Sequence, residues 1–282
     1  LHSFPTRRSS DLHIGASGTY DEAAILQARV RQELIERLAL VELAPGVILD
    51  LGSGTGRAAP SLAGHYPEAF ITALDLAASM LRKASAHAAA VCADASRLPF
   101  AANSVDLVFS NLMLQWCEEP DVVFDEVRRC LKPGGFFVFT TFGPDTLHEL
   151  RAAWSAADGF SHVHRFIDMH HIGDALVRAG FTEPVMDVER VRLTYADPVA
   201  LMRDLKAIGA HNVTSGRARG LTGRARFARM TAAYEAWRQG GRLPATYEVI
   251  YGAAWGAGER DAAPAIGGEA RIPIGAIRRR RP

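Results

Sequence analysis

The stretch "DLGSGTG", residues 50–56, follows an apolar run at residues 47–49 and places three glycines within five positions. Such a run, ended by glycine, is typical of a buried β-strand and the turn after it. Glycine permits a positive φ and lets a ligand lie directly against the backbone. In an open α/β sheet, ligands bind beyond the carboxyl ends of the strands, beside the first strand. The stretch therefore predicts a first strand followed by a ligand-binding turn.

Strand and helix patterns alternate around this turn. An amphipathic helix precedes it, starting at the capping-box pair Thr19 and Glu22 and ending near Ala39. The strands that follow are apolar on both faces, which is typical of a parallel sheet covered by helices on both sides. We therefore expect a doubly wound α/β fold. The predicted strands span residues 47–50, 70–76, 89–95, 105–111 and 136–142, with helices at 79–86 and 120–131.

The last part of the chain has a different pattern. Helices are expected at 145–157 and 172–179, and strands at 185–195 and 245–255. Two adjacent antiparallel strands need only a tight turn, yet helical patterns fill the sequence between these two. We interpret residues 196–243 as a helical lid, inserted between the last two strands and closing over the site.

The two ends of the chain lie outside this pattern. Residues 1–17 are interpreted as a disordered or foreign leader, because the opening residues show neither helical nor strand periodicity. Residues 259–282 are rich in glycine and alanine and end in arginines, so we expect a loose basic tail. The domain is therefore expected to span residues 18–258.

Composition and charge narrow the function classes. A formal net charge of +1 argues against a general nucleic-acid binder. No apolar run approaches the roughly 20 residues that span a bilayer, and the first residues lack the apolar core of a secretory signal. Cys92, Cys117 and Cys130 form no CxxC pair and are interpreted as thiols of a reducing cytosol. We expect a cytoplasmic protein without membrane or nucleic-acid partners.

The spacing of the glycines distinguishes between two ligand classes. Dinucleotide sites use G-x-G-x-x-G, with the pyrophosphate on a helix N-terminus. Here the spacing is G-x-G-x-G, and Arg57 stands where the third dinucleotide glycine would be. Asp50 stands two residues before the first glycine, and an anion there disfavours a pyrophosphate but suits a cation. The turn therefore favours S-adenosylmethionine, which carries an ammonium and a sulfonium.

Polar residues at the ends of the next strands support this ligand. Asp75 ends the second strand, where it can accept hydrogen bonds from both ribose hydroxyls. Asp94 ends the third strand, where it can receive the adenine amino group, and Ala95 can offer its backbone amide. Asn111 ends the fourth strand, near the position of methyl transfer. Each of these residues also has a purely structural alternative as a helix cap or turn residue.

Motifs along most of the chain resemble class I S-adenosylmethionine-dependent methyltransferases. The stretches with this resemblance are "ILDLGSGTG", "ALDLAASML", "CADASRLPF", "VDLVFSNLMLQW" and "LKPGGFFVFTTFGPDTLHEL". Later stretches resemble more narrowly the malonyl-acyl-carrier-protein O-methyltransferases of biotin synthesis. These are "TTFGPDTLHELR", "HRFIDMHHIGDALVRAGF", "LMRDLKAIGAHN" and "LPATYEVIYGAAW". That family often has cysteine where Ser53 stands.

The resemblance implies a seven-stranded, mostly parallel sheet and methyl transfer to the free carboxylate of malonyl on an acyl carrier protein. It also implies that Tyr20 lies over the cofactor or substrate. A carboxylate with a pKa of about 4 is already ionised at neutral pH, so we expect positioning residues, with Tyr20 and Asn111 as candidates, and no general base. The implied cofactor-binding residues are Asp50, Gly52, Ser53, Gly54, Asp75, Leu76, Asp94, Ala95 and Asn111.

Basic residues accumulate in the expected lid. They are Arg203, Lys206, Arg217, Arg219, Arg224, Arg226, Arg229, Arg238 and Arg242, against the acids Asp204 and Glu235. A solvated helical face is one interpretation, and a docking surface for an acidic acyl carrier protein is the other. Arginine recognises carboxylates in a forked geometry, and we expect Arg217 to bind the charged end of the substrate.

Three other functions remain alternatives. The late motifs also resemble the respiratory complex I assembly factor, which hydroxylates a protein arginine, and a non-catalytic cofactor-binding scaffold is possible. A dinucleotide oxidoreductase is disfavoured by Arg57. A metal site is not expected, because the group His162, His164, Asp168, His170 and His171 lacks a recognisable ligand spacing.

Overall fold

The computed structural model describes residues 12–15, 22–83, 87–160, 162–163, 166–207 and 223–258. Tyr20 and Arg217, to which we assigned substrate contacts, lie outside these ranges. The same is true of residues 1–11, 16–17 and 259–282, so the expected tail lies wholly outside the described residues and the expected leader is described only at residues 12–15. No helix in the described part of the chain combines the length and the apolar character needed to cross a bilayer.

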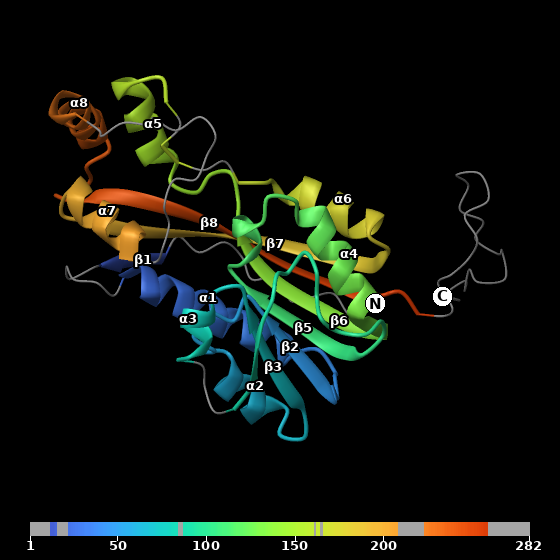
Figure 1. Ribbon diagram of the computed structural model, residues 1–282. Helices are drawn as coiled ribbons and strands as arrows, with labels where there is room; N and C mark the ends of the chain where they lie inside the picture. The colour runs from blue at the N-terminus through green and yellow to red at the C-terminus, as the bar shows by residue number, and fades with distance from the viewer. Residues whose placement is uncertain are drawn as a thin grey trace, which may run out of the picture.

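The strands form one sheet in the order β1-β7-β8-β6-β5-β2-β3-β4 (Figure 1). Only β8 runs antiparallel to its neighbours, and all other pairs are parallel. The seven strands expected from the sequence are β2 to β8, so the predicted mostly parallel α/β sheet is confirmed. The strands are β1 (Leu12–Gly15), β2 (Val47–Leu51), β3 (Phe70–Asp75), β4 (Ala89–Cys92), β5 (Val105–Asn111), β6 (Leu131–Phe142), β7 (Phe181–Tyr195) and β8 (Leu243–Gly256).

Strand β1 corrects the sequence prediction, which left these residues out of the fold as part of a leader. It pairs in parallel with β7 at the edge of the sheet, from Leu12↔Val191 to Gly15↔Thr194. Four residues are too few for an alternating pattern to stand out. The pairing is made by backbone hydrogen bonds to β7, which is far away in the sequence. Such pairing leaves no local signal in the sequence of β1.

Helices cover both faces of the sheet. They are α1 (Glu22–Leu38), α2 (Ala59–His65), α3 (Ala78–Leu81), α4 (Pro120–Cys130), α5 (His148–Ala157), α6 (Met169–Arg178), α7 (Pro198–Ala207) and α8 (Arg224–Glu235), with a 3₁₀ turn η1 (Leu114–Trp116). One apolar core contains side chains from α1, α2, α5, α7 and α8. The other contains side chains from α4 and α6, which lie side by side in Figure 1. Two cores on one sheet are what a doubly wound fold requires.

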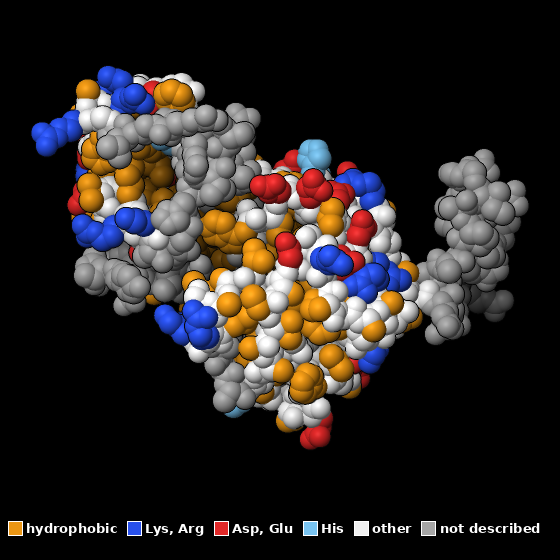
Figure 2. All heavy atoms as spheres, viewed as in Figure 1, with side chains coloured by type: hydrophobic (Ala, Val, Ile, Leu, Met, Phe, Trp, Pro, Cys, Tyr) orange, Lys and Arg blue, Asp and Glu red, His pale blue; other side chains and the backbone are white. Residues whose placement is uncertain are grey.

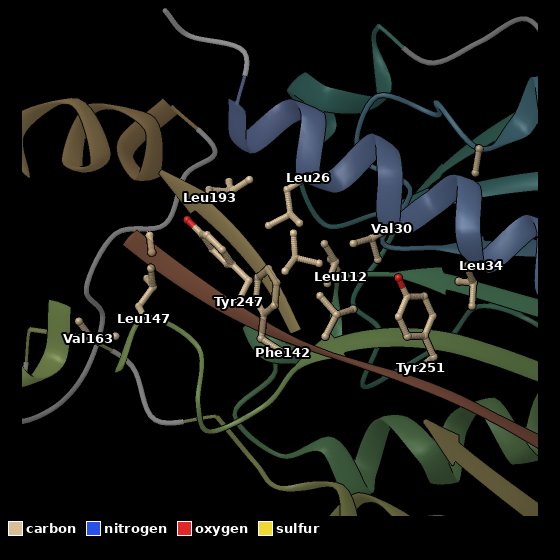
Figure 3. Close-up of a cluster of buried hydrophobic side chains, with 14 of the residues drawn as sticks. Leu26, Val30, Leu34, Leu112, Phe142, Leu147, Val163, Leu193, Tyr247 and Tyr251 are labelled. Carbon is tan, nitrogen blue, oxygen red and sulfur yellow. The ribbon is translucent and has the colours of Figure 1, made fainter. Parts of the chain in front are cut away.

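Helix α1 is fixed to the sheet by a row of leucine and valine. Leu26, Val30 and Leu34 are at most 2% exposed, and they repeat every four residues, so they share one helix face. In Figure 3 they point toward Leu112, which directly follows β5, and Tyr251 of β8. The helix predicted from the capping box is therefore present, and its buried face determines which of its other side chains approach the strand ends.

The excursion between the last two strands is helical, as expected. Strands β7 and β8 pair antiparallel from Phe181↔Gly256 to Tyr195↔Leu243, and α7 and α8 lie between them in the chain. Two hydroxyls join the insertion to the sheet: Tyr234 donates to the carbonyl of Pro244 at 2.6 Å, and Tyr195 donates to Asp204 at 2.9 Å. Helices α5, α7 and α8 gather at one end of the sheet (Figure 1).

Candidate functional site

The glycine-rich turn lies where the carboxyl ends of three strands meet. Asp50 of β2 pairs with Ala73 of β3 on one side and with Phe109 of β5 on the other. The backbone N–H groups of Gly52 and Ser53 both donate to the carbonyl of Leu74, at 2.8 and 2.9 Å. The turn is therefore held against the end of β3, at the point where the strand order reverses, which is the usual ligand position in such sheets.

Two of the glycines are required for different reasons. Gly52 has a φ of 73°, and a Cβ there would lie 2.1 Å from Cγ of Met113. Gly54 has a φ of 55°, but a Cβ there would meet nothing within 4 Å. Packing against Met113 therefore excludes a side chain at Gly52, whereas the backbone at Gly54 faces open space that a ligand can approach.

Asp50 is a buried carboxylate with one oxygen unpaired among the described residues. Its side chain is 2% exposed, and Oδ2 has no hydrogen-bond partner among the described residues. Burial is the main reason that its pKa is raised to about 7; the charge of Arg31 opposes the shift, and the charge of Asp75 adds a smaller increase. A buried acceptor left unpaired costs free energy. Oγ of Ser53, also in the turn, is buried without a partner. Both oxygen atoms could accept hydrogen bonds from a cationic ligand.

Asp75 holds the turn in place from the end of β3. Its Oδ2 accepts from the backbone N–H of Gly54 at 2.8 Å, and its Oδ1 accepts from that of Ala77 at 2.8 Å. Each carboxylate oxygen has a further lone pair, so these bonds leave acceptor capacity for a ligand. The next residue, Leu76, is 70% exposed. An exposed leucine directly after a half-buried carboxylate suits a ligand that has both an apolar face and hydroxyl groups.

Asp94 is organised by a local turn. Its Oδ1 accepts from both the backbone N–H and the hydroxyl of Ser96, each at 2.8 Å, and these bonds lower its pKa. The structural alternative considered for Asp94 is therefore real, and only Oδ2 is left for a ligand. Ala95 is half-buried against the second core. Burial and then the charge of Asp94 raise the pKa of Cys117 to about 11, which places a neutral thiol near this carboxylate.

Asn111 connects three elements at the end of β5. Its Oδ1 accepts from the hydroxyl of Thr140 at 3.0 Å, and its Nδ2 donates to the carbonyl of Gln27 in α1 at 3.5 Å. The side chain is half-buried. Its structural role is therefore established, and it also brings one turn of α1 to the strand ends.

Sequence reasoning missed Arg31, Met113 and Cys117 as neighbours of this turn. Sulfur atoms of Met113 and Cys117 lie 3.4 Å apart. Arg31 is half-buried in α1 and interacts electrostatically with Asp50 and Arg57. Met113 lies within the motif at residues 105–116, but its contact with the turn could not be read from that motif. Arg31 and Cys117 stand in no recognisable motif, and the contacts of all three depend on packing between distant segments.

The histidines take structural positions. His162 stacks on Trp154 with ring centroids 3.8 Å apart, and its Nε2 contacts Asp158 at 2.9 Å. Asp168 caps α6 by accepting from the backbone N–H groups of His170 and His171 at 2.9 and 3.0 Å. Within the described ranges, no group of three or more His, Cys, Asp or Glu could hold a metal ion. His164 lies outside those ranges.

The basic residues of the insertion divide into two groups. Arg229 donates to the carbonyl of Ala157, and Arg238 donates to Glu235 at 2.6 Å. Arg203, Lys206 and Arg224 are exposed and make no ion pair with any described residue. Figure 2 shows Lys and Arg side chains gathered at the end of the molecule where α7 and α8 lie.

Comparison with known proteins identifies the family. A family model described as a methyltransferase domain matches residues 49–139. The malonyl-[acyl-carrier protein] O-methyltransferase of Methylovorus sp. is 53% identical over 92% of this chain and 90% of its own length. The protein of the same name from Laribacter hongkongensis is 54% identical over 85% of this chain and 86% of its own length. The chain belongs to this family.

Solved structures agree on the fold. The YcgJ protein of Bacillus subtilis superposes with a TM-score of 0.58 at 15% identity, over 80% of this chain and 99% of that chain. Phosphoethanolamine N-methyltransferase 2 of Haemonchus contortus, solved with S-adenosyl-L-methionine, gives a TM-score of 0.50 at 17% identity, over 80% of this chain and 52% of that chain. The relatives confirm the family resemblance read from the sequence, and the solved structures confirm the fold.

The turn after β2 fits S-adenosylmethionine. Oδ2 of Asp50 has no hydrogen-bond partner among the described residues and can accept one from an ammonium group, and the open backbone at Gly54 leaves room for close approach. A buried carboxylate is a poor neighbour for the pyrophosphate of a dinucleotide. These observations agree with the preference for S-adenosylmethionine that the glycine spacing indicated.

Proposed function

We propose that this chain transfers the methyl group of S-adenosylmethionine to the free carboxylate of malonyl carried on an acyl carrier protein. The product is the malonyl methyl ester that starts pimeloyl and biotin synthesis. The observation that carries the proposal is the 53% identity to a malonyl-[acyl-carrier protein] O-methyltransferase across 92% of the chain. The reducing cytoplasm is the proposed compartment, since the free cysteines include the exposed Cys92.

The cofactor-binding residues are proposed from the strand ends. Asp50 would hold the α-ammonium, and the backbone of Gly52, Ser53 and Gly54 would lie along the methionine part. Asp75 would accept from the ribose hydroxyls, with Leu76 against the adenine. Asp94 and the backbone amide of Ala95 would bind the edge of the adenine ring. Support comes from the open space at Gly54 and the exposure of Leu76.

The reaction needs positioning more than proton transfer. The bound cofactor supplies an electrophilic methyl group on its sulfonium. A carboxylate acceptor is ionised at neutral pH, so no residue has to remove a proton before attack. Holding the acceptor oxygen in line can lower the barrier by roughly 7–11 kcal/mol. Asn111, fixed by Thr140 and α1, is the proposed positioning residue at the end of β5. Tyr20, outside the described residues, stays a candidate for the same role.

The helical insertion is the proposed dock for the acidic carrier protein. Arg203, Lys206 and Arg224 are exposed and make no ion pair with the described residues, so their charge is available to a partner. Arg229 and Arg238 are engaged in the fold and would contribute less. The assignment of Arg217 to the substrate carboxylate stays a prediction, because Arg217 lies outside the described part of the chain.

The function is tested with purified protein, malonyl-acyl-carrier protein and S-adenosylmethionine. Mass spectrometry of the carrier should show the malonyl group heavier by one methyl group in place of a proton. Addition of oxygen to a protein arginine would support the hydroxylase alternative instead. Cofactor binding without any turnover would support a scaffold. Complementation of a biotin-requiring strain that lacks this methyltransferase extends the test to the cell.

A further inference from the structure

One side of helix α1, which carries Gln27 and Arg31, faces the strand ends beside the glycine-rich turn. Leu26, Val30 and Leu34 bury the face that packs on the sheet, as Figure 3 shows. The carbonyl of Gln27 accepts from Asn111 at the end of β5. Arg31 lies four residues further on, so it stands on the same flank about 6 Å along the helix axis. Strand β2, whose end holds Asp50, is the neighbour of β5 in the sheet.

Arg31 differs from the other arginines of α1. Arg37 donates to Asp187 at 2.7 Å and to Glu33 at 3.0 Å, and Arg29 forms an ion pair with Glu189. Arg31 is half-buried and has no hydrogen bond to any described residue. A guanidinium carries five N–H donors, and leaving them partly desolvated without an acceptor costs free energy. Arg31 therefore has unused donors at the flank that faces the turn.

Asp50 and Arg31 are electrostatically coupled. The charge of Arg31 favours ionisation of Asp50, and the charge of Asp50 favours that of Arg31, while Arg57 disfavours the latter. The two groups form no ion pair, and Oδ2 of Asp50 has no hydrogen-bond partner in the part of the chain that the structure describes. The protein thus presents one buried anion and one half-buried cation near each other, both with unsatisfied hydrogen-bonding groups.

We propose that Arg31 binds the α-carboxylate of S-adenosylmethionine while Asp50 binds its α-ammonium. Both charges of the ligand are attached to the same carbon atom, so a zwitterionic amino-acid end requires one anion and one cation side by side in the protein. A forked guanidinium suits a carboxylate through two parallel hydrogen bonds. The inference depends on the cofactor alone and not on the identity of the methyl acceptor.

The test compares two ligands by isothermal titration calorimetry on the full chain. S-adenosylhomocysteine carries the α-carboxylate, and its decarboxylated analogue, S-adenosyl-3-thiopropylamine, keeps only the amine. We expect the wild-type protein to bind S-adenosylhomocysteine about 10- to 100-fold more tightly, the range for a charged hydrogen-bonded contact. Arg31→Gln should lose that preference, with the affinity for the analogue unchanged within about threefold.

Two further variants make the result specific. Arg57→Gln removes a nearby exposed cation and should keep the preference, which excludes a general effect of positive charge. Arg31→Lys keeps the charge without the fork and should retain part of the preference. An equal weakening of both ligands by Arg31→Gln would show a merely structural role. A wild-type protein that binds both ligands equally would overturn the proposal without any variant, and neither result would bear on the methyl acceptor.

Discussion

Replacing Asp50 by asparagine should stabilise the cofactor-free protein and abolish cofactor binding. The carboxyl is 2% exposed and Oδ2 has no partner, and burial raises its pKa from 3.8 to about 7. Ionising it inside the fold therefore costs more than ionising it in the unfolded chain. Asparagine keeps the shape and removes the charge.

The size and sign follow from proton linkage. Between pH 3.8 and about 7 the folded protein binds a proton at Asp50 that the unfolded chain has lost, so stability falls as the pH rises through this window. Each pKa unit corresponds to about 1.4 kcal/mol, which gives a penalty of about 4 kcal/mol, fully present above pH 7. This is an upper bound for the variant, because the asparagine amide is also left unpaired.

Urea unfolding of the cofactor-free protein between pH 4 and pH 8 measures the effect. The advantage of Asp50→Asn should be small at pH 4 and grow toward pH 8, while calorimetry shows no binding of S-adenosylhomocysteine. Asp106→Asn is the matched control of opposite sign. Lys132 and the backbone N–H groups of Val47 and Gly46 outweigh burial and lower the pKa of Asp106. That variant should lose stability by a nearly constant amount between pH 5 and pH 8, and the loss should shrink only in an added series below pH 4, as the pH falls toward the lowered pKa. An Asp50→Asn advantage that does not change with pH would refute the reasoning.

Three further predictions concern the turn, the insertion and α1. Gly52→Ala should destabilise the fold by about 2 kcal/mol or more, because its Cβ would overlap Met113. Gly54→Ala should fold but bind S-adenosylhomocysteine more weakly. Equal losses of stability in urea unfolding for the two variants would contradict the distinction. Charge reversal of Arg203, Lys206 and Arg224 to glutamate should raise KM for malonyl-acyl-carrier protein severalfold without changing cofactor affinity, and an unchanged KM would remove the proposed dock. Arg37→Ala should cost about 3 kcal/mol in urea unfolding, because it leaves Asp187 without its buried partner; a loss below about 1 kcal/mol would show that the ion pair contributes little.

The sheet and the cofactor turn could be predicted because their signals are local. Each buried strand is a short apolar run, and the glycines follow the first of them directly. The position of Asp50 and Asp75 beside the turn could be predicted for the same reason, since parallel strands bring their carboxyl ends to one edge. The ends of the strands were predicted less accurately. Strand β4 ends at Cys92, whereas the sequence predicted that it extends to residue 95.

The remaining features depend on contacts between distant segments. Gly52 was assigned to the ligand, yet the side chain of Met113 alone forbids a Cβ there. Arg31 interacts electrostatically with Asp50 only because α1 packs on the sheet with Gln27 at the end of β5. Strand β1 pairs with β7 through backbone groups. None of these contacts has a period or a motif in the sequence, so a structure was required to find them.

The most direct test of the account is a crystal structure of the protein with S-adenosylhomocysteine. The account predicts the ligand at the carboxyl end of β2, with its amino nitrogen about 3 Å from Oδ2 of Asp50 and its ribose hydroxyls on Asp75. A ligand bound elsewhere, or one bound there with that oxygen still unpaired, would contradict it.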